Sequence, residues 1–99
     1  MFDWNDLRFF LAVARTGSTL AAGRSLKVAQ ATVSRRITML EEALGTPLFV
    51  RSPSGYTLSV RGQAMLPHAE AVEREAEALQ NSVAAEGRRL SGTVRLTTV

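Results

Sequence analysis

The sequence predicts a mainly α-helical fold in which three helices and a small two-stranded β-hairpin are followed by one long helix. Three observations support this fold class. Apolar residues recur every three or four positions up to Leu44, strand-favouring runs flank the cluster "SPSG" at 52–55, and a heptad spacing of apolar residues begins at Met65. The chain has 99 residues, enough for one ordinary domain with a modest core.

The composition narrows the possible classes of function. The chain has no cysteine and one histidine, so we expect neither disulfides nor a metal site. The acidic N-terminus "MFDWNDL" and a longest apolar run of only "FFLAVA" predict a soluble, cytoplasmic protein without a membrane span. Residues 1–62 hold eight Lys/Arg against four Asp/Glu, whereas residues 63–99 hold four against five. The basic excess therefore lies in the first part of the chain.

The first helix is predicted from about Trp4 to Thr16. Asp3 is a suitable N-cap, and Gly17 supplies the stop. Between them, four apolar residues follow the spacing of one buried helix face: Leu7, Phe10, Leu11 and Ala14.

Two further helices are predicted with a very short connection between them. Ser18 can cap a short helix through "TLAAGRSL", and "KVA" then leads into a helix from Gln30 to Leu44, which Gly45 ends. The core face of this third helix is a single stripe of apolar residues, Val33, Ile37, Leu40 and Leu44. Two helices joined in this way predict a helix-turn-helix.

The outward side of this helix has the chemistry of a DNA-reading surface. Ala31, Arg35 and Thr38 lie opposite the stripe. Thr32 and Ser34 lie on the two flanks, and Gln30 is free at the N-terminal end. A helix about 10–12 Å wide fits a major groove of about 12 Å, Gln30 can pair with adenine, and Arg35 can pair with guanine. We expect Arg36 to contact phosphate or an intramolecular partner. An isolated amphipathic helix with such a face would usually be merely solvated, but residues 30–38 contain two arginines and no acid.

A small hairpin is predicted next, with strands at Leu48–Arg51 and Tyr56–Leu58 around the turn "SPSG". A hairpin beside a helix-turn-helix predicts a winged helix-turn-helix domain over residues 1–59, in which the hairpin can rest on the flanking DNA backbone.

A long helix capped by Ser59 is predicted over residues 60–89. Its heptad seam consists of Met65, Ala69, Val72, Ala76, Leu79 and Val83. This seam could pack on its own domain, but a helix about 40 Å long exceeds what a core of this size can cover, so we expect a dimer interface. Pro67 predicts a kink or a late start of the helix. Residues 90–99 contain "GTVRLTTV", which alternates as the first strand of a second domain.

The sequence contains no combination of residues that is typical of an enzyme active site. No Ser/His/Asp set, no pair of carboxylates on one face and no phosphate-cradling glycine loop is visible. We therefore expect a protein that is not an enzyme and needs no cofactor within these residues.

The run from "VAQATVSRRI" through "LEEALGTPLF" to "LSVRG" resembles the N-terminal winged helix-turn-helix and linker helix of LysR-type transcriptional regulators. The resemblance covers essentially the whole chain. It implies a sequence-specific DNA-binding regulator that binds an interrupted inverted repeat as a dimer, with the third helix in the major groove and antiparallel linker helices. It also implies a following domain that binds a small-molecule effector, and a possible tetramer of the full-length protein.

Carried over position by position, the resemblance implies base or groove contacts from Gln30, Ala31, Thr32, Ser34 and Arg35, with Thr38 a weaker candidate. It also implies phosphate contacts near Ser18. The chain departs from the family pattern at Ala29, where a serine or threonine cap is common, and at Thr19, where an aromatic is usual. The wing lacks a basic residue near its tip, so we expect only backbone contacts there, from Arg51, Ser54 or Tyr56.

Two alternatives stay open on the sequence alone. The long helix could carry the function, which would make the chain a coiled-coil protein-interaction module. A regulator of the molybdate-responsive type, with a similar wing and helix, is a narrower rival, although the strand-like "GTVRLTTV" after the long helix favours the LysR type.

Overall fold

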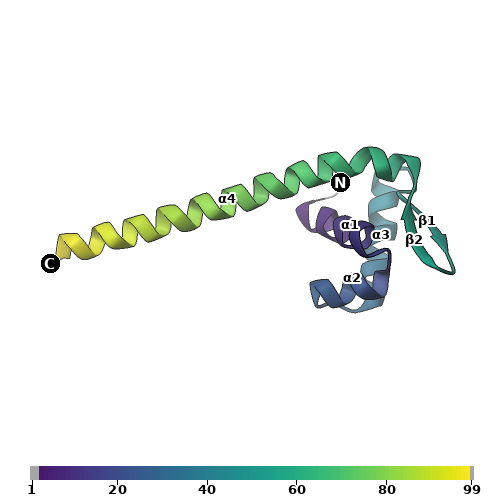
Figure 1. Cartoon of the computed structure of the whole chain (residues 1–99), viewed down its shortest axis with the longest axis horizontal. Helices are drawn as coiled ribbons and strands as arrows, with labels where there is room; N and C mark the ends of the chain where they lie inside the picture. The colour runs from purple at the N-terminus through teal and green to yellow at the C-terminus, as the bar shows by residue number, and fades with distance from the viewer. Residues whose placement is uncertain (1–2, 99) are drawn as a thin grey trace.

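A computed structural model describes residues 3–98, with side chains described up to Gly87. The elements in chain order are α1 (Trp4–Thr16), α2 (Thr19–Leu26), α3 (Gln30–Leu44), β1 (Phe49–Ser52), β2 (Gly55–Leu58) and α4 (Val60–Thr98). The first five form a small domain, and α4 extends far beyond it (Figure 1), so that the molecule measures 64 × 25 × 21 Å. The predicted fold class is confirmed.

The ends of α1 follow from its capping residues. The Asp3 carboxylate accepts a hydrogen bond from the Asp6 backbone N–H at 3.1 Å, and Asp6 accepts one from the Asp3 N–H at 3.0 Å. This reciprocal capping box satisfies two of the free donors at the helix start. Gly17 ends the helix in the left-handed region with φ 71°, which glycine adopts without a steric penalty.

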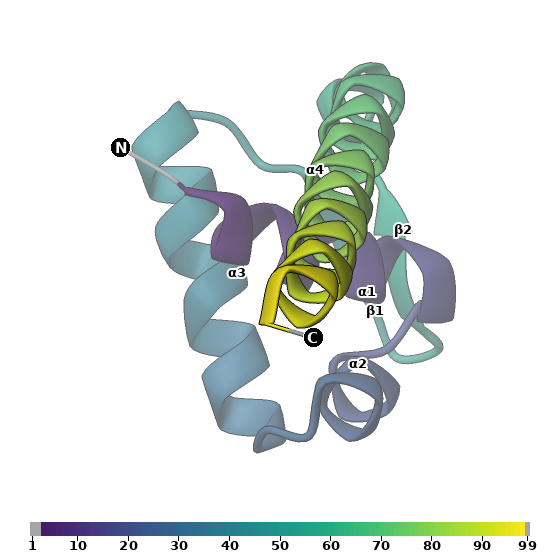
Figure 2. The same cartoon turned by 90° about the vertical axis from the view of Figure 1, so that its left-hand side faces the viewer.

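Helix α1 lies at the centre of the domain, where α2, α3, α4 and β2 all contact it. Figure 2, a view nearly along α4, shows these elements arranged around it. Because neighbours cover several sides of α1, its buried face is wider than the predicted stripe and also includes Phe9 and Val13. The stripe of α3 is confirmed at Val33, Ile37 and Leu40, while Leu44 is partly buried at the edge of the core.

The turn between α2 and α3 depends on a close backbone approach at Gly23. A Cβ atom on Gly23 would lie 2.7 Å from the Val28 carbonyl oxygen, so that any larger residue would force the turn apart. A glycine inside a helix usually weakens it, and the close approach to Val28 shows why glycine is nevertheless needed there. Lys27 completes the turn as a left-handed C-cap with φ 61°.

The hairpin pairs β1 with β2 in antiparallel register, from Phe49 opposite Leu58 to Ser52 opposite Gly55. Each strand therefore includes one residue that the sequence assigns to the turn, and Pro53 and Ser54 alone form the loop. The hairpin is attached to the turn after α1, because the Tyr56 N–H donates to the Gly17 carbonyl at 2.9 Å.

Helix α4 starts where predicted, with the Ser59 Oγ accepting a hydrogen bond from the Gly62 N–H at 3.0 Å. It runs through Pro67 without a break, so the expected late start is wrong and the alternative, a kink, stays a prediction. Pro67 is exposed, which lets water satisfy the carbonyl left without a donor, while packing of Leu66 and Ala69 against the core holds the helix in place.

The end of α4 differs from the prediction. Residues 92–98, expected to begin a strand, continue the helix to Thr98. A single strand without a partner would leave its backbone donors and acceptors unpaired, whereas a helix satisfies them within itself. The expected domain boundary near residue 90 stays a prediction. Across residues 3–98, no helix is both long enough and apolar enough to cross a membrane.

Candidate nucleic-acid interface

The outward face of α3 is arranged as the helical spacing predicts. Ala31, Arg35 and Thr38 are exposed on the side opposite the buried stripe, and Gln30 is exposed at the N-terminal end. Thr32 and Ser34 lie on the flanks and are half-buried. Thr32 borders a shallow hollow between α1 and α3, together with Phe9 and Arg36, so it is less accessible than Ala31 or Arg35.

The two adjacent arginines of α3 have different surroundings. Within the part of the chain that the structure describes, Arg35 is exposed and has no hydrogen-bond or ion-pair partner. Arg36 lies 3.7 Å from an Asp6 carboxylate oxygen, with its guanidinium 5.7 Å from the Phe9 ring centroid. The intramolecular alternative expected for Arg36 is therefore confirmed, and Arg35 is the α3 arginine left free to meet a ligand.

The N-terminal turn of α3 is open. Ala29, the N-cap residue, provides no side-chain hydrogen bond, so the first N–H groups lack the partner that a serine or threonine would supply. At the start of α2, by contrast, the Ser18 Oγ accepts a hydrogen bond from the Ala21 N–H at 3.1 Å. The Ser18 hydroxyl therefore caps its own helix.

The side chain of Gln30 is not free to rotate as its exposure alone would suggest. Its Nε2 donates a hydrogen bond to the Thr19 Oγ1 at 3.1 Å, which joins the first residue of α3 to the first residue of α2. Thr19 is not among the residues to which the sequence pattern assigns a role, and it has no sequence signal beyond its departure from the family pattern.

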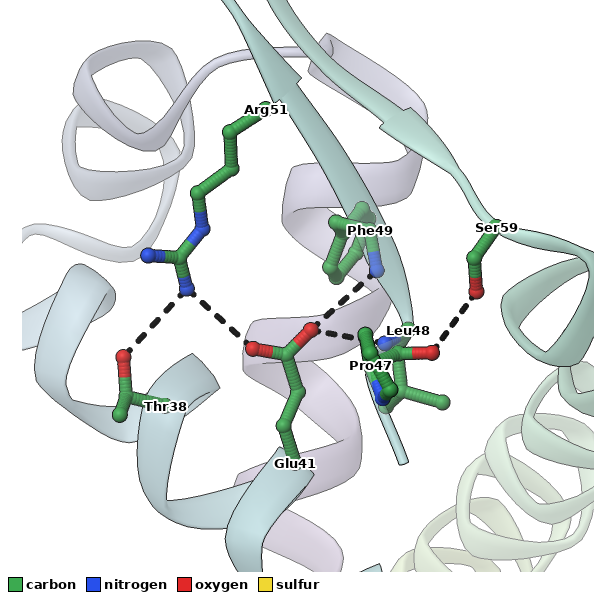
Figure 3. A network of polar contacts seen from close by, with 7 residues as sticks. All are labelled: Thr38, Glu41, Pro47, Leu48, Phe49, Arg51 and Ser59. Carbon is green, nitrogen blue, oxygen red and sulfur yellow. Dashed lines mark hydrogen bonds and ion pairs between the residues drawn. The ribbon is translucent and has the colours of Figure 1, made fainter. Parts of the chain in front are cut away.

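The C-terminal half of α3 is tied to the wing through Glu41 (Figure 3). Its Oε2 accepts hydrogen bonds from the Leu48 N–H at 2.7 Å and the Phe49 N–H at 3.3 Å, and its Oε1 lies 3.2 Å from Arg51 Nη2. The same Arg51 nitrogen donates to the Thr38 hydroxyl at 3.4 Å. Sequence reasoning missed this role of Glu41, because the contacts join residues that only the folded turn brings together.

The wing residues have partners within the domain. Arg51 lies over the Tyr56 ring at 5.3 Å, and Tyr56 packs edge-on against Phe49 with ring centroids 5.9 Å apart. Ser54 is exposed in the loop, with its Oγ 2.9 Å from the Ser52 Oγ. Arg51 and Tyr56 are thus primarily structural within the wing, while their outer surfaces remain accessible.

The predicted seam of α4 divides into two parts. Ala69 is 1% exposed in the core of its own domain, so its assignment to a dimer interface is corrected. Met65 is half-buried against that core, and its assignment stays a prediction. The first turns of α4 are the part that packs on the domain, where α4 contacts α1 and β2. Beyond them, Val72, Leu79 and Val83 are exposed and Ala76 is half-buried.

A bidentate ion pair fixes α4 to α1. Arg15 Nη1 and Nη2 donate to the two carboxylate oxygens of Glu73 at 2.8 and 2.6 Å, and Glu70 lies 4.0 Å from the same guanidinium. The hydrogen bonds from Arg15 lower the pKa of Glu73, and the same bonds raise the pKa of Arg15. Sequence spacing does not predict this pair, because its members are far apart in the chain.

Metal chemistry finds no support in the described part of the chain. Over those residues, no group of three His, Cys, Asp or Glu side chains comes together that could hold a metal ion.

Comparison with known proteins agrees with this architecture. A family model described as "Bacterial regulatory helix-turn-helix protein, lysR family" matches residues 4–63. The transcriptional activator AmpR of Providencia stuartii is 49% identical over 63 residues, which are 64% of this chain and 22% of that protein. The transcriptional regulator CzcR of Bacillus thuringiensis (strain Al Hakam) is 33% identical over 99 residues, 100% of this chain and 33% of that protein.

Among solved structures, a complex titled CbnR_DBD-DNA superposes with a TM-score of 0.78 at 31% identity. The match covers 87% of this chain and 99% of that one. This chain spans a third or less of the length of these two curated relatives. They are transcriptional regulators rather than enzymes, and the residues that the family model matches contain the helix-turn-helix and the wing. The chain belongs to the lysR family of bacterial regulatory helix-turn-helix proteins.

Proposed function

We propose that this chain is the DNA-binding part of a transcriptional regulator and that it inserts the N-terminal half of α3 into the DNA major groove. The observation that carries this proposal is the contrast between the arginines. Arg36 and Arg51 are each paired with an acid, whereas Arg35 points outward among small residues with no partner in the described chain. An unpaired guanidinium on a face without acid is suited to a base edge or a phosphate.

Each residue of this face has a distinct proposed role. Arg35 pairs with guanine O6 and N7, and Gln30 pairs with the N6 and N7 of adenine. Short side chains at Ala31, Thr32 and Ser34 let the helix backbone come close to the bases. Thr38 lies further along the face, where Arg51 already engages its hydroxyl, so its contribution is smaller.

The residues around α3 are proposed to contact the DNA backbone. The N-terminus of α2 at Ser18 and the uncapped start of α3 present backbone N–H groups suited to phosphate. Arg51, Ser54 and Tyr56 place the wing against the flanking strand. These contacts set orientation rather than sequence preference.

We also propose that two copies associate through α4. The exposed apolar residues Val72, Leu79 and Val83 are spaced by seven and four, which places them on one stripe, with the half-buried Ala76 between them. Each copy would present one recognition helix to one half-site of an interrupted inverted repeat. We further propose that the whole protein carries an effector-binding domain beyond this part, forms a tetramer and acts in the cytoplasm. For the further domain, the support is that this chain covers only 22% and 33% of two relatives' length.

The test of groove binding is the variant Arg35→Ala, compared with Arg74→Ala as a charge-matched control on α4. We expect Arg35→Ala to weaken binding to a selected duplex by about 1–3 kcal/mol and to relax the base preference at one position. The control should bind nearly as well as the parent. Equal affinity and equal preference for Arg35→Ala and the parent would contradict the proposal.

The test of dimerisation is the double variant Val72→Glu with Leu79→Glu, measured by sedimentation. Buried glutamates would disfavour a helix pair, so we expect monomers and weaker binding to a two-half-site operator. A persistent dimer would refute the proposed interface. A dimer that fails to retard any duplex at low salt would instead favour a protein-interaction module.

A further inference from the structure

Thr19 combines deep burial with a polar contact to the proposed reading face. Of the side chains whose burial is described, it is the one buried polar side chain, with 4% exposure. Its Oγ1 accepts a hydrogen bond from Gln30 Nε2 at 3.1 Å. A buried hydroxyl needs such a partner, and the residue that supplies it is exposed at the start of α3.

This contact has a consequence for the chemistry that Gln30 presents. A glutamine amide has an acceptor end and a donor end, and rotation by half a turn exchanges them. With Nε2 directed to Thr19, the amide keeps Oε1 as a free acceptor and retains one Nε2 hydrogen. An acceptor beside one donor complements adenine N6 and N7, whereas the exchanged orientation would offer donors toward guanine O6 and N7.

We propose that Thr19 is a positioning residue for base recognition, which fixes the Gln30 amide in the orientation that favours adenine over guanine. The inference rests on the proposed insertion of α3 into the groove. Thr19 does not touch DNA in this account. It acts by ordering a flexible side chain before binding, so that less rotamer entropy is lost when the base contact forms.

The hydrogen bond can be tested in the free protein, without DNA. In Thr19→Val, which keeps the side-chain shape but removes the hydroxyl, we expect the Gln30 side-chain NH₂ resonances to move together and the side chain to become more mobile by ¹⁵N relaxation. Thr19→Ser should retain the parental signals. Unchanged resonances in Thr19→Val would overturn the proposal, whatever the protein does with DNA.

The effect on recognition is tested with duplexes that carry each of the four bases at the position whose preference is lost in Gln30→Ala. Thr19→Val should reduce the preference for adenine over guanine by about 3- to 10-fold, the range expected for one net hydrogen bond. Thr19→Ser should restore it, and the preference at the position read by Arg35 should stay the same. Thermal unfolding of each variant separates this effect from loss of fold, with Thr19→Ala as a second variant if Thr19→Val does not fold.

The outcomes are distinct. A preference for guanine in the parent protein, or an unchanged preference in Thr19→Val, would overturn the positioning role. If the protein binds no duplex although Thr19 holds the Gln30 amide, the proposed function is refuted. The role of Thr19 in recognition is then refuted as well, because it depends on DNA binding. If Thr19 merely fastens α2 to α3, Thr19→Val would lower the unfolding temperature without altering base preference.

Discussion

The two halves of α3 have the same helical geometry but opposite surroundings. From Gln30 to Arg36 the outward face has no acid and no cap from Ala29, and it carries the unpaired Arg35. From Ile37 to Leu44 the helix is held by the core and by the contacts of Glu41 with β1 and Arg51. The first half has exposed residues that can contact a ligand, whereas the second half packs against the rest of the domain.

Stability and recognition are therefore separable along this single helix. The second half of α3 is held by the buried Ile37 and Leu40 and by the contacts of Glu41. The first half is held by the buried Val33 and by the contacts of Gln30 and Arg36, while Arg35 stays free. Substitutions in the two halves should therefore act on different measurements. Changes in the C-terminal half should lower the free energy of unfolding, and changes at Arg35 should affect DNA binding alone.

The largest effect on stability is expected at a core residue in the second half of α3. Leu40→Ala removes a side chain that is 1% exposed, so it should lower the free energy of unfolding by about 2–5 kcal/mol. Its neighbour Met39 is 53% exposed, and Met39→Ala should change stability by less than about 0.5 kcal/mol. Denaturant unfolding of both variants measures the contrast, and similar losses would show that α3 is not held by this stripe.

A smaller loss is expected at Glu41. The side chain is 14% exposed, and Glu41→Ala leaves the Leu48 and Phe49 N–H groups without their acceptor. We expect a loss of about 2 kcal/mol, as for hydrogen bonds to a charged acceptor. Glu42→Ala is the matched control, because Glu42 is exposed and its side chain makes no hydrogen bond or ion pair among the described residues. Equal free energies of unfolding for the two variants would show that the contacts of Glu41 with the wing do not stabilise the fold.

Local sequence signals predicted most of this fold. Asp3, Ser18, Gly17 and Gly45 mark helix ends by their own chemistry, and the bounds of α1, α2 and α3 match the predictions. The contacts between elements were not predictable, because they join residues of different elements that only the folded chain brings together: Glu41 with β1, Arg15 with Glu73, and Gln30 with Thr19. The long seam failed at Ala69 for the same reason, since heptad spacing does not reveal which surface covers it.

The first half of α3 can be stabilised by a capping residue at its N-terminus. Ala29→Ser supplies an oxygen that can accept from the Ala31 or Thr32 N–H, and it should raise the free energy of unfolding by about 1 kcal/mol. Ala43→Ser, an exposed substitution inside the same helix, should instead cost up to about 0.5 kcal/mol. Chemical denaturation of both variants measures the two effects. A gain as large at Ala43 would mean that capping is not the cause.

The smallest effect is expected for the ion pair between Arg15 and Glu73, whose side chains are partly exposed to solvent. Glu73 is 25% and Arg15 48% exposed at the side chain, compared with 14% for Glu41, so Glu73→Gln should cost at most about 1 kcal/mol, and less at high salt. Because Arg15 lowers the pKa of folded Glu73, the contribution is present above the ordinary glutamate pKa of about 4.3. It is lost as the pH falls through the lowered value.

Unfolding of the parent and Glu73→Gln between neutral pH and about pH 3 measures this dependence, with Glu75→Gln as an exposed control. The two stability curves should converge in acid for Glu73→Gln, and the Glu75→Gln curve should follow the parent throughout. A difference that persists at low pH would mean that the carboxylate acts through packing rather than charge. The Arg15–Glu73 pair would then stabilise the fold by packing, as the second half of α3 does, although its side chains are more exposed.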